Sequence, residues 1–304
     1  MFKQLLIVGS VVLLLSCGGG TAIIYTQGDL LSHEFRNAVP STKRISGDYF
    51  KVYKNRNQFV VAAEQLSHHG HLVARSTYNY SRSGQITRQQ NTDYFKTGLP
   101  RTVREWTYKN GKVQQKEEQW FTRSRNLEKK STVYYDTFQR PYLEQTWGLG
   151  DRFESSTEYY YDFKGRLDKA RRNFFSTDGD LRDYWLTIYN DREQIVTEEH
   201  YLPDNSMLTF YRYTYHPVKN YREEEEELDA ATNRFTIRRF NEYGWITSEV
   251  EKDRQLNLLG SRQYEYSEKM KPLFIYHYDA SGKLILKEKY VTPEQLVASR
   301  TPRL

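Results

Sequence analysis

The stretch Tyr278 to Leu284, YDASGKL, decides the fold, because variants of it recur at nearly even spacing along most of the chain. Asp279 suits the first position of a type I turn, where its carboxylate can accept backbone hydrogen bonds. Gly282 suits the fourth position, where a positive φ is often needed. Tyr278 and Leu284 then become the last and first residues of two paired strands. The stretch therefore predicts a β-hairpin turn.

Other stretches share an aromatic residue, a glycine four positions later and an aliphatic residue six positions later: YSRSGQI (80–86), YDFKGRL (161–167), FSTDGDL (175–181) and FNEYGWI (240–246). The residue that enters each predicted turn recurs every 12 to 14 residues. The series is Tyr53, Leu66, Tyr80, Tyr94, Tyr108, Phe121, Tyr135, Gly148, Tyr161, Phe175, Tyr189, Tyr201, Tyr215, Leu228, Phe240, Lys252, Tyr266 and Tyr278.

That interval holds one strand of about eight residues and one turn of four or five. We expect an all-β fold in which about eighteen short strands form a long antiparallel meander, an open and twisted repeat sheet. Two connections fit less well. We expect Gly148 to Asp151 to be irregular, and Asp253 to Gly260 to be longer than the other turns.

YDFKGRL and YDASGKL resemble the YD repeats of the Rhs family, and the array is similar to the short hairpin repeats of MORN-type and YwqK-like proteins. The resemblance covers about residues 50 to 290, and in most copies Ser, Asn or His replaces the Asp. It implies a β-repeat fold with an interaction or scaffolding role. The YwqK-like resemblance also implies immunity to a toxin as an alternative, although a fold does not fix a function.

Residues 1–16 have the features of an export signal, with Lys3 near the start and an apolar run from Leu5 to Leu15. The run is too short to span a bilayer as a mature helix. The residues Leu14 to Cys17 resemble the lipobox of bacterial lipoproteins, which implies cleavage before Cys17 and attachment of lipid to its thiol. Gly18 follows Cys17, and the sorting rule of Gram-negative lipoproteins then favours the outer membrane. The alternative is an ordinary signal peptide that ends near a cysteine.

Three further segments complete the predicted organisation. Residues 17–46 show no clear period and are interpreted as the lipidated cysteine and a tether. Residues 47–290 form the YD-like β-repeat domain. Residues 291–304 form a C-terminal tail that could begin a short capping helix, with Thr292 as N-cap and Pro293 at the first helical position. Cys17 is the only cysteine, so the chain forms no internal disulfide.

The strands carry charges at both odd and even positions, as in KVQQKEEQW (112–120), so neither face of the sheet is purely apolar. Burial must then come from aromatic rings near the turns and from the stems of long side chains. We expect the 26 tyrosines to cover apolar area while their hydroxyls stay in water.

Two clusters of ionisable residues invite a specific function. His68, His69 and His71 could present imidazoles to a metal, but nothing nearby completes a ligand set, so a solvated turn is favoured and no metal is expected. The run from Glu223 to Glu227 could attract calcium or a cationic partner. Neutralisation by the next predicted strand, which holds Arg234, Arg238 and Arg239, is favoured instead.

The sequence contains no GxSxG, no HExxH, no phosphate-cradling loop and no nucleophilic cysteine beyond Cys17. We therefore expect no catalytic residues and no cofactor. The 45 basic and 39 acidic residues are interspersed and give a net charge of +6, which does not favour nucleic acid as a partner.

The function expected from these features is that of an outer-membrane-anchored lipoprotein that acts as a non-catalytic interaction or scaffolding module in the cell envelope. Its partners would be the membrane, through Cys17, and envelope proteins. A glycan-binding or cell-wall-binding module is the main alternative, because exposed aromatic rings can stack on sugars. The candidate rings are Trp106, Trp120, Trp147, Trp185 and Trp245, for which packing at the sheet surface is the other interpretation.

Overall fold

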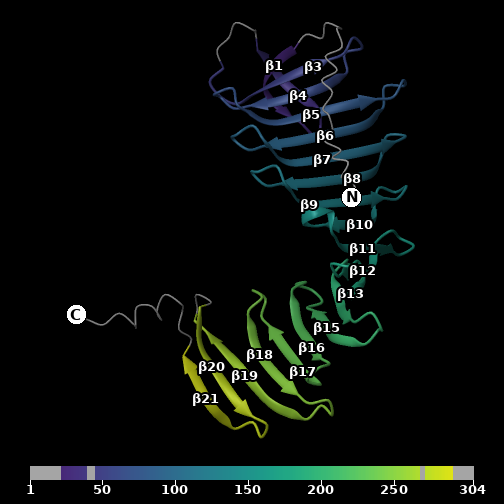
Figure 1. Ribbon diagram of the computed structural model, residues 1–304. Coiled ribbons are helices and arrows are strands. Elements are labelled where there is room, and N and C mark those ends of the chain that lie inside the picture. The colour runs from purple at the N-terminus through teal and green to yellow at the C-terminus, as the bar shows by residue number, and fades with distance from the viewer. Residues whose placement is uncertain (1–21, 40–44, 268–270, 290–304) are drawn as a thin grey trace, which may run out of the picture. The chain divides into compact units, whose positions relative to one another are not determined.

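The computed structural model describes residues 22–39, 45–267 and 271–289, and these residues form an all-β structure (Figure 1). Within these ranges twenty-one strands belong to one open antiparallel sheet, and one short 3-10 helix, η1 (Leu149–Asp151), interrupts them. The predicted fold class is confirmed, with somewhat more strands than the eighteen expected. Residues 1–16, Cys17 and the tail 291–304 lie outside the described residues.

The first eleven strands are β1 (Ala22–Asp29), β2 (Glu34–Val39), β3 (Tyr49–Lys54), β4 (Val60–Leu66), β5 (Leu72–Tyr80), β6 (Ile86–Tyr94), β7 (Pro100–Lys109), β8 (Lys112–Phe121), β9 (Leu127–Tyr135), β10 (Pro141–Trp147) and β11 (Phe153–Tyr161). The others are β12 (Leu167–Phe175), β13 (Leu181–Tyr189), β14 (Ile195–Tyr201), β15 (Met207–Tyr215), β16 (Arg222–Asp229), β17 (Arg234–Phe240), β18 (Ile246–Lys252), β19 (Leu258–Tyr266), β20 (Pro272–Asp279) and β21 (Leu284–Lys289).

The predicted turn positions are confirmed, because each of the eighteen residues in the series lies within one residue of the end of a strand. In the deciding stretch, the Asp279 amide donates to Lys283 O and the Gly282 amide donates to Asp279 O, both at 3.0 Å. The Asp279 carboxylate accepts the amides of Ser281 and Lys283 at 2.9 Å each. Tyr278 then pairs with Leu284, after a shift of register. The hairpin therefore has the geometry that the sequence predicts.

The fourth position of the turn adopts the left-handed conformation even where it is not glycine. Gly282 has a φ of 81°, and Leu256 occupies the same position with a φ of 65°. The prediction that Asp253 to Gly260 is longer than the other turns is wrong, because Lys252 pairs with Leu258 in the usual register. This turn lacks the glycine that marks many of the others, because Leu256 takes the positive φ in its place.

The tyrosines that enter the turns do more than cover apolar area. Some of them donate their hydroxyl to the carbonyl oxygen of a residue twenty positions earlier, at the start of the adjacent strand that precedes them in the sheet. These bonds are Tyr80 to Val60 (2.7 Å), Tyr215 to Ile195 (2.9 Å) and Tyr266 to Ile246 (2.7 Å). The expectation that tyrosine hydroxyls stay in water is wrong for these residues.

The segment predicted to be a tether contains two strands, so residues 17–46 are not an irregular tether throughout. β1 pairs with β2 and also with β3, which gives the order β2, β1, β3 at this end of the sheet. The segment lacks the repeat motif, but Ile23, Ile24 and Tyr25 are half-buried. Burial of apolar area and the backbone ladder with β3 therefore order a stretch that carries no turn signature.

A small apolar core lies where the tip of the β1–β2 hairpin folds over the sheet. Leu30, 6% exposed, packs with Phe50, Val52, Ala63 and Ala74. The Tyr78 hydroxyl donates to Leu30 O, and the His33 ring lies 4.1 Å from the Tyr78 ring. Burial lowers the pKa of His33 and raises the pKa of Tyr78 to about 12.

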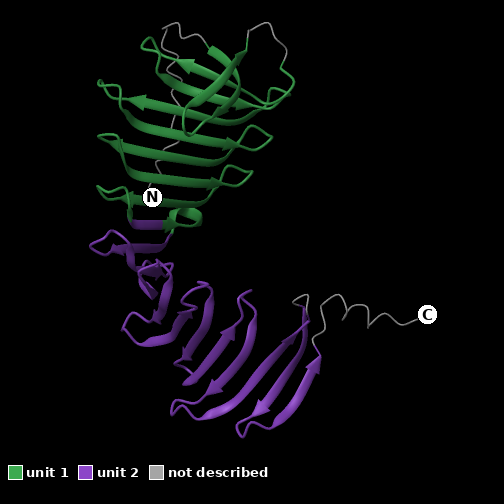
Figure 2. Cartoon of the chain, turned by 180° about the vertical axis from the view of Figure 1, so that it is seen from behind, with its two compact units in different colours: residues 1–141, 146–152 green, residues 142–145, 153–304 purple. Residues whose placement is uncertain are grey.

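The chain divides into two compact units (Figure 2). Unit 1 contains residues 1–141 and 146–152, and unit 2 contains residues 142–145 and 153–304.

Two substitutions at the fourth turn position test the cost of the left-handed conformation. Gly244 has a φ of 79°, and no atom lies within 4 Å of the point that a Cβ would occupy, so Gly244→Ala should destabilise the protein by about 1 kcal/mol through backbone strain alone. Leu256, 61% exposed, buries little, and Leu256→Gly should be neutral or stabilising by up to about 1 kcal/mol. Urea unfolding of both variants measures the difference, and equal destabilisation would contradict this account of the turn.

Candidate functional site

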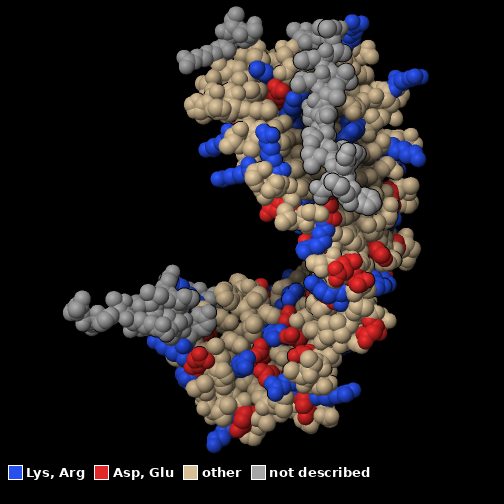
Figure 3. Space-filling model, viewed as in Figure 1, with Lys and Arg blue, Asp and Glu red and all other residues tan. Residues whose placement is uncertain are grey.

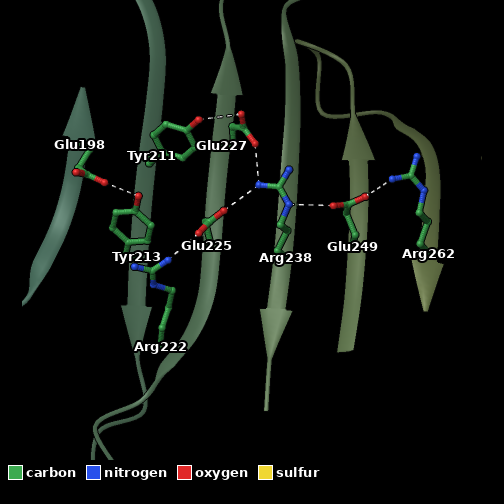
Figure 4. Close-up of polar contacts among 9 residues, drawn as sticks. All are labelled: Glu198, Tyr211, Tyr213, Arg222, Glu225, Glu227, Arg238, Glu249 and Arg262. Carbon is green, nitrogen blue, oxygen red and sulfur yellow. Dashed lines mark hydrogen bonds and ion pairs between the residues drawn. The ribbon is translucent and has the colours of Figure 1, made fainter. Parts of the chain in front are cut away.

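A network of polar side chains lies on one face of strands β14 to β19 in unit 2 (Figure 4). The register places Glu225 opposite Arg238, Arg238 opposite Glu249, and Glu249 opposite Arg262, so four consecutive strands alternate in charge. Cross-strand neighbours lie on the same face of a sheet. We call this set the Arg238 network; its members are Glu198, Tyr211, Tyr213, Arg222, Glu225, Glu227, Arg238, Glu249 and Arg262.

Arg238 is the centre of the network because its guanidinium contacts three carboxylates. Its Nη1 lies 2.8 Å from Glu225 and 2.7 Å from Glu227, and its Nε lies 2.9 Å from Glu249. Burial alone would lower the pKa of Arg238, but its hydrogen bonds with the three carboxylates outweigh burial and raise it. The Glu249 side chain is 8% exposed and also binds Arg262 at 2.5 Å.

Two tyrosines extend the network to the neighbouring strands. The Tyr213 hydroxyl donates to Glu198 at 2.6 Å, and the Tyr211 hydroxyl donates to Glu227 at 3.1 Å. Burial and the hydrogen bond with Glu198 raise the pKa of Tyr213, so its hydroxyl remains a donor. Arg222 lies 4.2 Å above the Tyr213 ring. The result is a surface whose polar groups are fixed by one another.

The predicted neutralisation by the next strand is confirmed for Glu224, Glu225 and Glu227. Glu225 contacts Arg238, and Glu224 contacts Arg239 at 2.9 Å. Glu226 instead contacts Arg212, on the preceding strand, at 3.3 Å. Sequence reasoning missed the tyrosine members and Glu198, although they occupy alternate positions of predicted strands and could have been placed on this face by register.

The five tryptophans do not gather into a single exposed row. Trp185 stacks on His200 at 4.5 Å with planes 13° apart, so these rings face each other rather than solvent. Trp245, 42% exposed, is tilted against Tyr266. The other three are half-buried: Trp106, Trp120 beneath Lys129 at 5.5 Å, and Trp147 beneath Lys130 at 5.1 Å.

The histidine cluster occupies the exposed β4–β5 turn, where the ring centroids of His68 and His69 lie 3.8 Å apart and those of His69 and His71 lie 6.3 Å apart. Within the described ranges, no three His, Cys, Asp or Glu residues are placed to hold a metal ion. The same ranges contain no helix with the length and apolar character needed to cross a membrane.

A depression of about 370 Å³ lies on strands β11 to β14 and the β14–β15 turn of unit 2. Aromatic rings with cations above them form much of its wall: Lys169 lies 4.9 Å from the Tyr160 ring, and Arg171 lies 4.2 Å from the Tyr184 ring. Tyr184 stacks on Tyr201 at 5.1 Å. The hydrogen bond with Glu199 and burial raise the pKa of Tyr201 to about 12.

The two units differ in charge. Among the described residues, unit 1 has 19 Lys and Arg against 11 Asp and Glu, whereas unit 2 has 20 against 26. Figure 3 shows basic side chains projecting from the margins of unit 1, and acidic and basic side chains interleaved on unit 2. Each unit therefore offers partners a different surface.

No known family model matches the sequence, and no curated protein matches it. Among solved structures, the chain is similar to the TcdB2–TccC3 toxin complex, at 11% identity, covering 81% of this chain and 17% of that chain with a TM-score of 0.19. It is also similar to porin-like proteins from Bacteroides uniformis and Bacteroides vulgatus. The Bacteroides uniformis protein is 11% identical, with 76% of this chain and 88% of that chain covered and a TM-score of 0.28. The Bacteroides vulgatus protein is also 11% identical, with 90% of this chain and 98% of that chain covered and a TM-score of 0.25. The chain thus spans about a sixth of the TcdB2–TccC3 chain.

Substitution of Arg238 tests whether the network holds unit 2 together. Arg238→Ala leaves three carboxylates close together without their shared cation and should destabilise the protein by about 2 kcal/mol. The matched control is Arg239→Ala, whose side chain is 64% exposed and contacts only Glu224 among the described residues, and whose cost should stay within about 0.5 kcal/mol. Urea unfolding compares the two variants, and equal costs would show that the network contributes nothing beyond a surface ion pair.

Proposed function

We propose that this chain is a non-catalytic, lipid-anchored interaction module of the bacterial cell envelope, held at the outer membrane through Cys17 and binding envelope proteins with the faces of its repeat sheet. The lipobox-like residues Leu14 to Cys17 support the anchor. The YD-like repeats of the Rhs family and the resemblance to MORN-type repeats support an interaction role.

The Arg238 network is the observation that carries the interaction role. Its side chains are partly exposed, yet ion pairs and tyrosine hydrogen bonds fix their positions across six strands. A surface that is already ordered loses less conformational entropy when a partner binds. Alternating carboxylates and guanidiniums can also align a partner that carries the complementary charges.

Labelling and affinity capture test the two parts of this proposal separately. Radiolabelled palmitate should enter the wild-type chain and not Cys17→Ser, and only the wild type should fractionate with the outer membrane. Capture from detergent-solubilised membranes should recover the same envelope protein with the wild type and with Arg239→Ala, and much less of it with Arg238→Ala. Recovery with all three chains would place the contact elsewhere. Absence of label would remove the anchor.

The depression around Tyr160 favours a glycan as a second class of ligand. Its tyrosine rings, flanked by Lys169 and Arg171, suit an acidic sugar that can contact an aromatic edge and pair its carboxylate with a cation. Its volume lies near the lower end of the range of small-molecule sites.

A glycan array tests this second candidate. Tyr160→Ala and Arg171→Ala should each lower binding of a uronic-acid glycan by at least about tenfold, which corresponds to the loss of one charge-assisted or aromatic contact. Tyr243→Ala, on the exposed β17–β18 turn, serves as the control. Binding that is insensitive to Tyr160 and Arg171 would exclude the depression as the site.

A further inference from the structure

Three turns of unit 1 place basic side chains along one edge of the sheet. Alternate connections of an antiparallel meander lie on the same edge, so the β3–β4, β5–β6 and β7–β8 turns form a line with about 10 Å between neighbours. Their exposed cations are Arg56, Arg82, Lys109 and Lys112, which we call the basic turn row. Residues 54–59, 80–85 and 108–113 contain no Asp or Glu.

Neighbouring turns hold this row in place. The Phe59 ring of the β3–β4 turn stacks on Tyr80 at 5.0 Å and lies so close to Gly84 that a Cβ there would be 2.9 Å from it. The Lys112 ammonium donates to Thr137 O at 2.6 Å. In the described part of the chain, Arg56, Arg82 and Lys109 contact no carboxylate, so unit 1 itself does not neutralise their charge.

The start of β1 lies at the same edge. Ala22 pairs with Tyr53, two residues before the β3–β4 turn begins at Asn55. Cys17 precedes Ala22 by five residues, which can span at most about 18 Å. Any group attached to Cys17 is therefore confined to the neighbourhood of the edge that carries the basic turn row.

We propose that the basic turn row of unit 1 lies against the anionic headgroups of the bilayer that holds Cys17. This inference rests on the proposed lipidation of Cys17. Each Lys or Arg near an anionic bilayer surface strengthens binding by roughly fivefold, so four together orient a chain that is already anchored.

Position, and not charge alone, selects this edge. The opposite edge, formed by the β4–β5, β6–β7 and β8–β9 turns, is also basic, with Lys96, Arg123 and Arg125 in its turns. A strand of nine residues, such as β5, separates the two edges by about 30 Å. The span available to Cys17 is shorter than that separation, so the anchor favours the edge at which β1 begins.

Fluorescent probes at matched turn positions test the orientation. Cys17 is the only native cysteine, and lipid attachment blocks its thiol, so Ser83→Cys and Thr97→Cys each supply one free thiol at the third position of a turn on opposite edges. The lipidated chain is placed in phosphatidylglycerol vesicles that contain a headgroup quencher. The probe at position 83 should be quenched several-fold more strongly than the probe at position 97. Equal quenching, or stronger quenching at position 97, would overturn the proposal.

Charge reversal with a matched control tests the cause. The four residues of the row are changed together, as Arg56→Glu, Arg82→Glu, Lys109→Glu and Lys112→Glu, in both probe chains. This charge reversal should abolish the difference in quenching between positions 83 and 97. Lys96→Glu, Arg101→Glu, Arg123→Glu and Arg125→Glu, with the same total change of charge on the opposite edge, should preserve it. Circular dichroism establishes that both variants keep their strands. If both charge reversals abolish the difference in quenching, or if neither does, electrostatic docking by the row is contradicted.

Two further experiments distinguish this inference from the proposed lipidation of Cys17. In the Cys17→Ser background, charge reversal of the row should weaken binding to phosphatidylglycerol vesicles by at least about six hundredfold, and the binding should vanish in phosphatidylcholine vesicles. Failure of palmitate labelling together with that result would remove the anchor and keep a lipid-binding row. Normal labelling of Cys17, together with no effect of charge reversal in the row, would keep the anchor and remove the lipid-binding row. A chain that binds an anionic polysaccharide but shows no edge-specific quenching on vesicles also overturns the proposal.

Discussion

The hairpin turn is the constraint on which the rest of the structure depends, because it sets the register of each strand pair. The aromatic residue that ends one strand faces the aliphatic residue six positions later, as in Tyr161 with Leu167 and Tyr80 with Ile86, with a shift of register just before the pair. A slip by one residue would exchange the two faces of a strand. Repetition of the same turn therefore keeps each face consistent from strand to strand, which is why Glu225, Arg238, Glu249 and Arg262 meet.

The sequence predicts the parts of the structure that depend on neighbours in the chain. Turn positions, strand ends and the pairing of Glu225 with Arg238 follow from a fixed spacing, since each involves adjacent strands. It does not predict bonds from a side chain to the backbone of the adjacent strand, such as the bond from the Tyr215 hydroxyl to Ile195 O, because they depend on the side-chain rotamer and on the local twist of the two strands. It also missed β1 and β2, because no repeat motif identifies them.

The stability of the sheet has two sources, which lie in different places. In unit 1 the tip of the β1–β2 hairpin provides a second layer, so that Val52 and Ala63 are fully buried beneath it or beside it. In the described part of unit 2 few apolar residues are buried, and half-buried tyrosines and ion pairs cover most of the strands. Exposed ion pairs contribute little on their own. Arg238 differs because three carboxylates share it and Glu249 is shielded from water, so its contribution depends on the whole set.

The turn also explains how charge can vary between the units without altering the fold. In several turns the first residue supplies an oxygen that accepts the amides two and four residues later, or the latter alone, whereas Phe95 and Leu202 hold this position without a side-chain oxygen. Asp279 supplies a carboxylate oxygen, whereas Asn55 accepts the amides of Asn57 and Phe59 with a neutral amide, and the Ser81 hydroxyl accepts the amide of Gln85.

Hydrogen bonds from the Ser281 side chain and from the Lys283 amide hold the pKa of Asp279 below its usual value, so that this turn carries a negative charge. Asn55 and Ser81 satisfy the same backbone groups without adding a charge beside Arg56 and Arg82. The geometry of the turn thus leaves the charge of the edge free to change. The β3–β4 and β5–β6 turns of unit 1 combine neutral acceptors with basic residues in adjacent positions, and this combination gives the edge an uncompensated positive charge next to the start of β1.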